Sequence, residues 1–176
     1  DELKHCKNYM NIQKYRYKER FVTEYDVSEE IYPFCTVKLI LQPILENAIN
    51  YGVGSMDDCG EIKVTGRMQG ENIILSVTDN GLGMTEEEVD LILTDSKRIR
   101  KHGSGVGLVN VNNRIQILFG KEYGLVVESE PDEGTTVSIC IPAVLYTEDN
   151  REDLEKGRMF RKEETAKEVQ VKRDDE

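Results

Sequence analysis

The chain has 176 residues, 38% of them hydrophobic, so it can bury one sizeable core, and a single domain with appendages is expected. Its formal net charge of −11 excludes a nucleic-acid-binding surface, because such a field repels phosphate backbones, and any polyanionic ligand needs a metal ion or a local basic patch. The four cysteines are widely spaced without a CxxC pair, which favours free thiols over disulfides or a metal site.

The first half of the chain predicts a helix, a strand and a second helix. A loose apolar stripe indicates a helix over residues 1–20, and alternating apolar and polar residues indicate a strand over 20–27. Apolar residues at helical spacing predict the next helix over 36–51. Pro43 should kink this helix, because proline offers no amide to the carbonyl four residues back.

The second half predicts two hairpins separated by helices. Strands are expected over 61–68 and 72–78, then over 125–129 and 135–141. Between them, Thr85 caps a short helix that reaches Leu93, residues 96–104 form a basic loop, and a helix over 106–119 ends at Gly120. Strands joined mainly by tight turns give a mixed, mostly antiparallel sheet with helices on one face. The expected fold is therefore a two-layer α/β sandwich.

Two motifs carry polar side chains on rigid elements. LQPILENAINYG (41–52) places Glu46, Asn47 and Asn50 on the polar side of a helix, where adjacent carboxylate and amide oxygens suit Mg²⁺. Taken alone, this pattern fits a solvated helix face better. VTDNGLGM (77–84) ends a strand on Asp79, whose carboxylate can accept a hydrogen bond from an exocyclic amine such as adenine N6. An ordinary β-turn is the simpler explanation of that motif alone.

Two further motifs are glycine-rich. GSGVGLVNVNNR (103–114) opens a helix with alternate glycines, so free backbone amides can face phosphate oxygens. It has neither the spacing of a dinucleotide-binding loop nor that of a P-loop, and the chain lacks the HRD and DFG segments of eukaryotic-type protein kinases. EGTTVSI (133–139) leads from a glycine into a strand, and a plain hairpin turn explains it equally well.

Together, ENAINYG, DNGLGM, GSGVGL and EGTTV resemble the four nucleotide-binding boxes of the GHKL ATPase superfamily, in the same order. The segments LQPILENAI, FGKEYGL and NYMNIQKYRY are similar to those of YesM/LytS-like sensor histidine kinases. The resemblance covers about residues 3–142. It implies the histidine-kinase ATPase fold, with ATP and Mg²⁺ as ligands.

The resemblance also implies a role for each matched residue. Glu46 would be catalytic and polarise the imidazole of the acceptor histidine, and Asn47 would bind Mg²⁺ between the nucleotide phosphates. Asp79 would bind adenine N6 with help from Thr135. Residues from about 86 to 102 would form a lid over ATP, with Lys97, Arg98, Arg100 and Lys101 near the phosphates. The full set of expected nucleotide-binding residues is Asn47, Asn50, Tyr51, Asp79, Gly81, Gly83, Met84, Lys101, Gly103, Ser104, Gly105, Val106, Gly107, Leu108 and Thr135.

The sequence departs from the family pattern in two places. Many relatives carry a basic residue at the position of Asn50. No segment resembles NPHFLFN, which carries the phosphoacceptor histidine in this family. His5 lies in a charged helix and is expected to be solvated, and His102 lies in the lid. The acceptor histidine is therefore expected upstream of this sequence.

The expected function is that of a histidine protein kinase's ATP-binding catalytic domain, which transfers the γ-phosphoryl group to that histidine for relay to a response regulator. Residues 1–19 would end a dimerisation helix, 20–143 would form the catalytic domain, and 144–176 a charged tail. The expected partners are ATP, the receptor's own dimerisation and phosphoacceptor domain, and the regulator, with homodimerisation only through the upstream segment. No run of ~18 apolar residues is present, so this sequence is not expected to span a membrane itself. The resemblance implies the cytoplasmic domain of a membrane-anchored receptor.

Two other functions remain open from the sequence. An anti-sigma-type serine kinase shares the four boxes and suits a small chain, although the NIQKYRY helix argues against it. A nucleotide-sensing interaction module would bind ATP without transferring phosphate, and the presence of Glu46 argues against that function.

Overall fold

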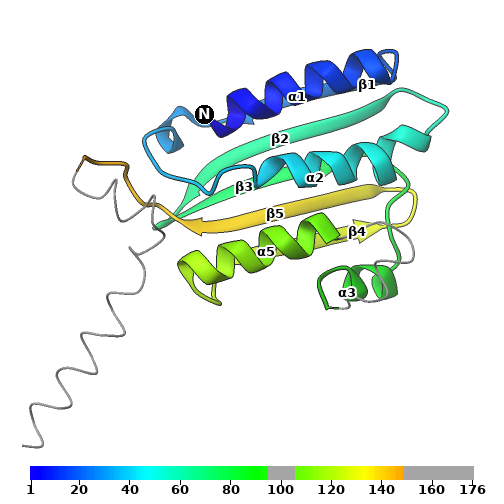
Figure 1. The fold of residues 1–176 in the computed structure, drawn as a ribbon. Helices are drawn as coiled ribbons and strands as arrows, with labels where there is room; N and C mark the ends of the chain where they lie inside the picture. Colours follow the sequence, from blue (N-terminus) through cyan, green and yellow to red (C-terminus); the bar gives the residue numbers. More distant parts are fainter. Residues whose placement is uncertain (95–105, 149–176) are drawn as a thin grey trace, which may run out of the picture.

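The structure, a computed structural model, describes residues 1–94 and 106–148 and contains a five-stranded sheet in the order β1-β2-β3-β5-β4. Helices α1, α2 and α5 all lie across one face of this sheet (Figure 1). The predicted two-layer α/β sandwich is therefore confirmed. The strands are β1 (Phe21–Val27), β2 (Gly60–Gln69), β3 (Asn72–Asp79), β4 (Gly124–Glu130) and β5 (Gly134–Pro142).

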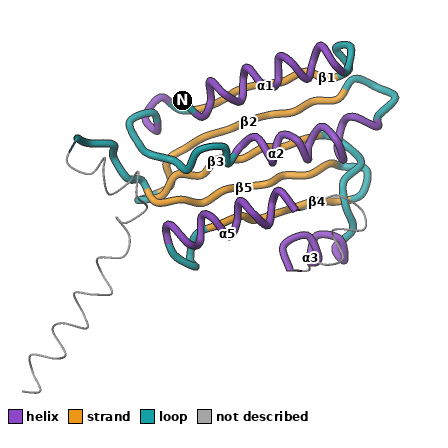
Figure 2. Tube along the Cα trace, in the orientation of Figure 1, coloured by secondary structure: helices purple, strands orange, loops and turns teal. Residues whose placement is uncertain are grey.

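The sheet is mixed because one pair of strands is parallel. β1 pairs parallel with β2, whereas the β2–β3, β3–β5 and β5–β4 pairs are antiparallel. Parallel neighbours need a crossover, and helix α2 (Leu41–Asn47) lies within the connection that provides it (Figure 2). The helix continues through a wide, π-helical turn over Ala48–Gly52. The crossover thus lays the first polar motif across the inner face of the sheet.

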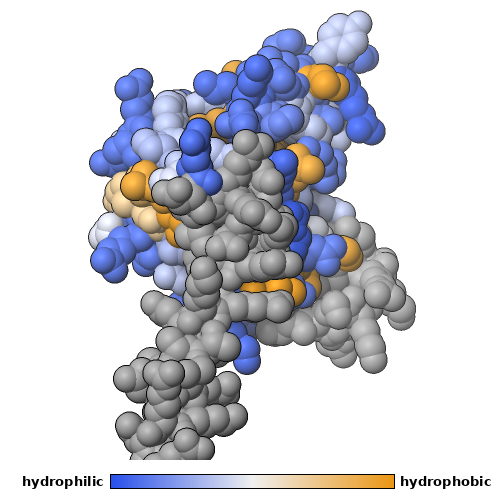
Figure 3. Space-filling view, turned by 60° about the vertical axis from the view of Figure 1, so that its left-hand side comes forward, coloured by the Kyte–Doolittle hydropathy of each residue, from blue (hydrophilic) through white to orange (hydrophobic). Residues whose placement is uncertain are grey.

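Strand alternation directs one set of side chains towards the helices. On β3, Ile73, Leu75 and Val77 are buried, and Asp79 takes the next inward position. On β5, Val137, Ile139 and Ile141 are buried in the same way. The outward set is polar: Ser76 and Ser138 share a hydrogen bond of 2.9 Å, and Thr78 and Thr136 one of 3.0 Å. Where described residues are visible in Figure 3, that side of the molecule is mainly hydrophilic, with hydrophobic residues in small separate groups.

Helix α1 (Glu2–Arg16) belongs to the same packed layer. Its Cys6 and Met10 are buried in the common core. At its start, the Glu2 carboxylate accepts hydrogen bonds from the backbone N–H groups of three consecutive residues, at 2.8, 2.9 and 3.0 Å. These residues are Leu39, Ile40 and Leu41, so Glu2 caps the first turn of α2 from a different helix.

The predicted helix over residues 36–51 was wrong at its start. The helix begins at Leu41, and Leu39 has a positive φ of 57°. Val37 and Ile40 are buried although they precede the helix, which explains why their spacing looked helical. Pro43 is the third helical residue, where an amide would have no intrahelical partner, so no ladder bond is lost and the reason for the predicted kink does not apply.

The remaining helices flank the second hairpin. Helix α3 (Glu86–Thr94) starts at a reciprocal cap, in which Glu88 N–H donates to Thr85 Oγ1 at 3.3 Å and Thr85 N–H donates to Glu88 Oε2 at 2.9 Å. Helix α5 (Val106–Phe119) ends before Gly120, whose φ is 113°. The rest of the predicted lid lies outside the described residues. Within the described part, no helix is long and apolar enough to cross a membrane.

Candidate nucleotide-binding site

A cavity of about 340 Å³ lies between α2, α3, the start of α5 and the inner ends of β3 and β5. Most of its wall is apolar, and the side chains that can make polar contacts are Asp79, Asn47, Thr135, Glu88 and Tyr51. This composition suits a flat, partly polar ring system. The predicted residues that line the cavity are Asn47, Tyr51, Asp79, Gly83, Met84, Leu108 and Thr135.

Asp79 is the most unusual side chain of this cavity. It follows three inward apolar residues on β3 and is only 5% exposed. Burial raises its pKa to about 6, while hydrogen bonds from the backbone of Gly81 and Thr135 act in the opposite direction. The Gly81 N–H donates to Asp79 Oδ1 at 2.9 Å. A carboxylate placed where a core residue would pack favours a ligand that donates to it.

Close backbone approach around Asp79 explains the glycines of the DNGLGM motif. A Cβ on Gly81 would overlap the backbone of Gly52, and one on Gly52 would overlap the Asp79 carboxylate. Gly83 has a φ of 64°, and a Cβ there would meet the Glu130 carbonyl. Larger residues at these positions would push the turn away from Asp79 and reshape the cavity.

Glu46 and Asn47 are adjacent in sequence but face different spaces. Asn47 lines the cavity with Asp79, whereas Glu46 lines a surface groove of about 580 Å³ between α2 and α5. Gln42 Nε2 donates to Glu46 Oε1 at 3.0 Å and holds it at the groove. Asn47 Nδ2 is buried and, among the described residues, has no hydrogen-bond partner. Adjacent residues of one helix turn thus line both the cavity and the groove.

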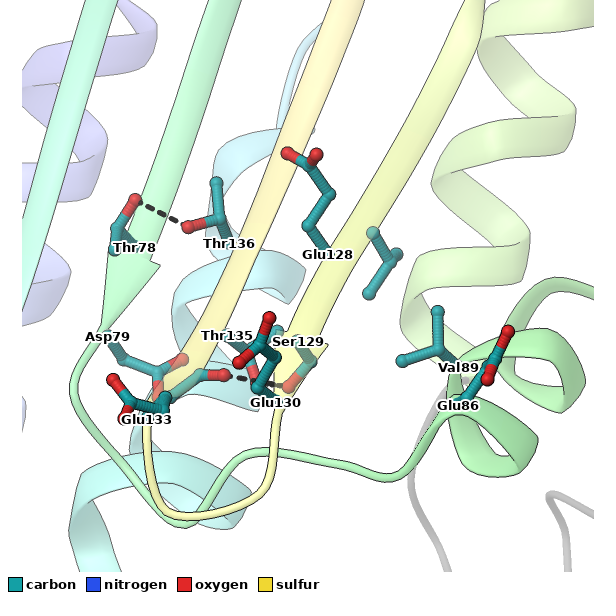
Figure 4. A pocket seen from close by; sticks show the side chains of 12 residues that line it. Thr78, Asp79, Glu86, Val89, Glu128, Ser129, Glu130, Glu133, Thr135 and Thr136 are labelled. Atoms are coloured by element: carbon teal, nitrogen blue, oxygen red, sulfur yellow. Dashed lines mark hydrogen bonds between the residues drawn. The ribbon is translucent and has the colours of Figure 1, made fainter.

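The hairpin β4–β5 supplies a contact that the sequence analysis did not foresee. Ser129 Oγ accepts from the Met84 N–H at 2.8 Å and lies 2.8 Å from Thr135 Oγ1. Figure 4 shows Ser129 and Thr135 among the residues that line a second hollow, of about 550 Å³, at the ends of β3, β4 and β5. That hollow is lined by Glu86, Glu128, Glu130 and Glu133, so its charge does not suit phosphate.

Comparison with protein families gives a match over residues 36–145 to the family described as histidine kinase-, DNA gyrase B-, and HSP90-like ATPases. The chain belongs to this ATPase family. The matched range contains every described residue of the cavity. The predicted resemblance is therefore confirmed.

Individual relatives of this ATPase domain include sensor kinases. The Bacillus subtilis (strain 168) protein YwpD is 38% identical over 142 residues, which are 80% of this chain and 48% of that protein. Sensor histidine kinase YesM of the same organism is 33% identical over 143 residues, 81% of this chain and 23% of the kinase. The chain therefore spans less than half the length of these relatives.

Among solved structures, the catalytic domain of histidine kinase ThkA has a TM-score of 0.60 at 17% identity, covering 82% of this chain and 94% of that one. This likeness supports the fold.

The other residues predicted to bind nucleotide in the ATPase domain lie in several places. Asn50 is exposed and accepts a hydrogen bond from Tyr17 Oη at 3.1 Å, so it does not line the cavity. Gly81 packs against Gly52 and Asp79 and does not line the cavity. Gly107 lines the Glu46 groove and packs near Pro43. Val106 is exposed at the start of α5 and lines neither space. Lys101, Gly103, Ser104 and Gly105 lie outside the described residues, as do Lys97, Arg98, Arg100 and His102.

Sequence reasoning missed most of the apolar wall of the cavity. The side chains of these residues do not by themselves indicate nucleotide binding. Only their position in the folded chain brings them to the cavity. Gly52 is the last residue of the LQPILENAINYG motif, and the sequence gives no sign that Gly81 packs against it. The missed lining residues are Ile44, Ala48, Gly52, Val77, Leu82, Glu88, Leu91, Ile92 and Val137.

Proposed function

We propose that this ATPase domain is the catalytic domain of a histidine protein kinase, which binds ATP with Mg²⁺ and transfers the γ-phosphoryl group to a histidine of its receptor's dimerisation domain. The observation that carries the proposal is the orientation of Glu46 and Asn47 into different spaces. A nucleotide in the cavity meets Asn47. A protein segment lying in the groove meets Glu46.

Asn47 fits the role of metal and phosphate ligand. Its unpaired, buried Nδ2 can donate to a phosphate oxygen, while its Oδ1 is a neutral oxygen ligand of the kind that Mg²⁺ accepts. No group of three His, Cys, Asp or Glu side chains that could hold a metal occurs in the described ranges, so the phosphates would complete the coordination. When bound, Mg²⁺ would offset the phosphate charge.

Glu46 would act on the acceptor imidazole. Its carboxylate accepts the hydrogen bond of one ring N–H, which orients the ring and leaves the lone pair of the other nitrogen free. That nitrogen forms the N–P bond as the bond from the γ-phosphorus to the bridging oxygen breaks and ADP leaves. The Gln42–Glu46 hydrogen bond keeps the carboxylate at the groove.

The proposal extends to the rest of the receptor. Residues 1–19 would be the end of a dimerisation helix, and 144–176, of which 149–176 lie outside the described residues, would be a charged tail. A response regulator would take the phosphoryl group from the histidine. The relative YesM is named a sensor histidine kinase, and ThkA has also been solved in complex with the response regulator protein TrrA. The domain would lie on the cytoplasmic side of a membrane-anchored receptor.

Phosphorylation assays test the transfer step directly. Incubated alone with labelled ATP, the chain should remain unlabelled on histidine, because His5 is exposed on α1 and stands in no acceptor context. It should label a separately supplied dimerisation fragment that carries the acceptor histidine. Acid-labile, alkali-stable label on this chain alone would contradict the proposal. Labelled serine on a small partner protein would instead support the anti-sigma-type kinase, and binding without any transfer would support the nucleotide-sensing module.

Nucleotide selectivity tests the base-binding end of the cavity. ATP with Mg²⁺ should bind at least about ten-fold more tightly than GTP, because adenine N6–H donates to Asp79 whereas guanine O6 would face it as a second acceptor. An unmet buried polar contact costs roughly 1–3 kcal/mol. Titration calorimetry with both nucleotides gives the ratio, and equal affinities would refute the adenine assignment.

A further inference from the structure

Ser129 is the meeting point of the two turns that border the base end of the cavity. Its Oγ accepts from Met84 N–H, in the DNGLGM turn, at 2.8 Å. It donates to the Gly134 carbonyl at 2.7 Å and lies 2.8 Å from Thr135 Oγ1, both in the EGTT segment. Figure 4 shows Ser129 and Thr135 next to each other at the ends of β4 and β5, with Asp79 at the end of β3.

The direction of each of these hydrogen bonds follows from counting protons. A hydroxyl has one proton to donate and two lone pairs. Gly134 O can only accept, so at 2.7 Å the single proton of Ser129 must lie between the two oxygens. Otherwise two acceptors would face each other at hydrogen-bond distance. The proton between Ser129 and Thr135 must therefore belong to Thr135.

This assignment leaves Thr135 Oγ1 with lone pairs only. Thr135 lines the nucleotide cavity and is the direct β-sheet partner of Asp79. The base end of the cavity thus displays two neighbouring acceptors, a carboxylate and a hydroxyl oxygen that cannot turn its proton towards a ligand. Such an edge matches a group with two N–H donors, directly or through a water molecule.

We propose that Ser129 is a specificity-determining residue. By engaging the Thr135 proton, it makes the cavity select a purine with an amino group at position 6 over a purine with a keto oxygen there. The inference rests on the proposed ATP-binding function. Ser129 itself does not line the cavity, so it acts through Thr135.

The test compares ATP with inosine triphosphate, which carries an oxygen in place of the 6-amino group. In Ser129→Ala, the Thr135 hydroxyl is free to donate to that oxygen. The ratio of ATP to inosine triphosphate affinity, measured by calorimetry with Mg²⁺, should fall by about threefold to tenfold, the value of one neutral hydrogen bond. Ser129→Thr, which keeps the hydroxyl, should retain the wild-type ratio.

Two controls separate this role from a structural one. Ser138→Ala breaks the matching Ser76–Ser138 hydroxyl pair on the outer face and should leave the ratio unchanged. In a Thr135→Val background, Ser129→Ala should no longer change the ratio, because no hydroxyl remains to reorient. If Ser129→Ala does not fold, Ser129→Cys, with a weakly bonding thiol of similar shape, should lower the ratio in the same direction.

Each outcome decides between these explanations. A ratio that Ser129→Ala leaves unchanged, or lowers equally in the Thr135→Val background, would overturn the inference while leaving ATP binding intact. Failure of the wild-type chain to bind either nucleotide would instead refute the proposed function.

Discussion

Glu46→Gln should bind ATP and Mg²⁺ with near-normal affinity yet transfer phosphate to an added acceptor fragment about 10²–10⁴-fold more slowly. Glutamine keeps the shape of the side chain and its hydrogen-bonding capacity but loses the charge that polarises the imidazole. Binding is preserved because Glu46 faces the groove between α2 and α5 and not the nucleotide cavity. Calorimetry measures the first quantity and single-turnover labelling the second.

Asn47→Ala is the matched comparison one residue away. It should weaken metal-dependent ATP binding, because the side chain that lines the cavity loses both its oxygen ligand and its N–H₂ donor. Glu128→Gln, an exposed carboxylate on β4, should change neither binding nor transfer. If Glu46→Gln loses binding as severely as Asn47→Ala, Glu46 belongs to the metal site, and its assignment to the acceptor imidazole is wrong. If both variants transfer normally, this helix face is only a solvated surface.

Asp79→Asn should make the chain more stable and unable to bind ATP tightly. The carboxylate accepts from Gly81 and lies open to the adenine amine, and an amide offers one acceptor and one donor in its place. Either orientation of the amide sets a donor against a donor. The loss of a charge-assisted bond together with that clash should weaken ATP binding by roughly 100-fold.

The stability effect has a defined pH dependence. The pKa of Asp79 in the folded chain is about 6, raised from 3.8 by burial. Because this pKa is raised in the folded chain, protonated Asp79 adds its full contribution to the free energy of unfolding below about pH 4. That contribution is lost as the pH rises through 6. Above pH 7 the ionised carboxylate therefore costs up to about 3 kcal/mol of unfolding free energy. Asp79→Asn should recover part of this lost unfolding free energy at pH 8 and none at pH 4.

Chemical denaturation at the two pH values measures the difference. Asp26→Asn provides a control of opposite sign, because the hydrogen bond from Arg67 lowers the pKa of this exposed carboxyl group. Loss of the Asp26 carboxylate should slightly destabilise the chain at pH 8. A destabilised Asp79→Asn at pH 8 would contradict the view that the buried charge is held for ligand binding at the expense of stability.

The sequence alone was sufficient to predict the two-layer fold and Asp79 as the polar residue at the centre of the cavity. Inward alternation on β3 ends on a carboxylate, and short turns force neighbouring strands to pair, so both the sheet and Asp79 follow from local patterns. The start of α2 could not be predicted from the sequence. Val37 and Ile40 are buried although they lie in a non-helical turn, in which Leu39 has a positive φ. Hydrophobic spacing cannot distinguish that turn from a helix.

Long-range hydrogen bonds were equally invisible in the sequence. Asn50 stands at a helical spacing that suits a phosphate ligand, but Tyr17, 33 residues earlier, bonds to it. Ser129 follows no motif, and its position beside Thr135 and Met84 exists only once the hairpin has folded against the DNGLGM turn. Local patterns thus identify groups with strong chemistry, and tertiary contacts decide which of them meet.

The cap that Glu2 places on α2 joins two helices mechanically. Three amide protons at Leu39, Ile40 and Leu41 end on one carboxylate, and each such bond to a charged group contributes about 1.5–3 kcal/mol. These protons are exposed to solvent exchange only when the beginning of α1 leaves the first turn of α2. Displacing the start of α1 therefore either breaks these hydrogen bonds or moves the first turn of α2 with it. Glu46 and Asn47 follow within two helical turns of this cap, so the Glu2 carboxylate helps to fix the helix that carries both residues.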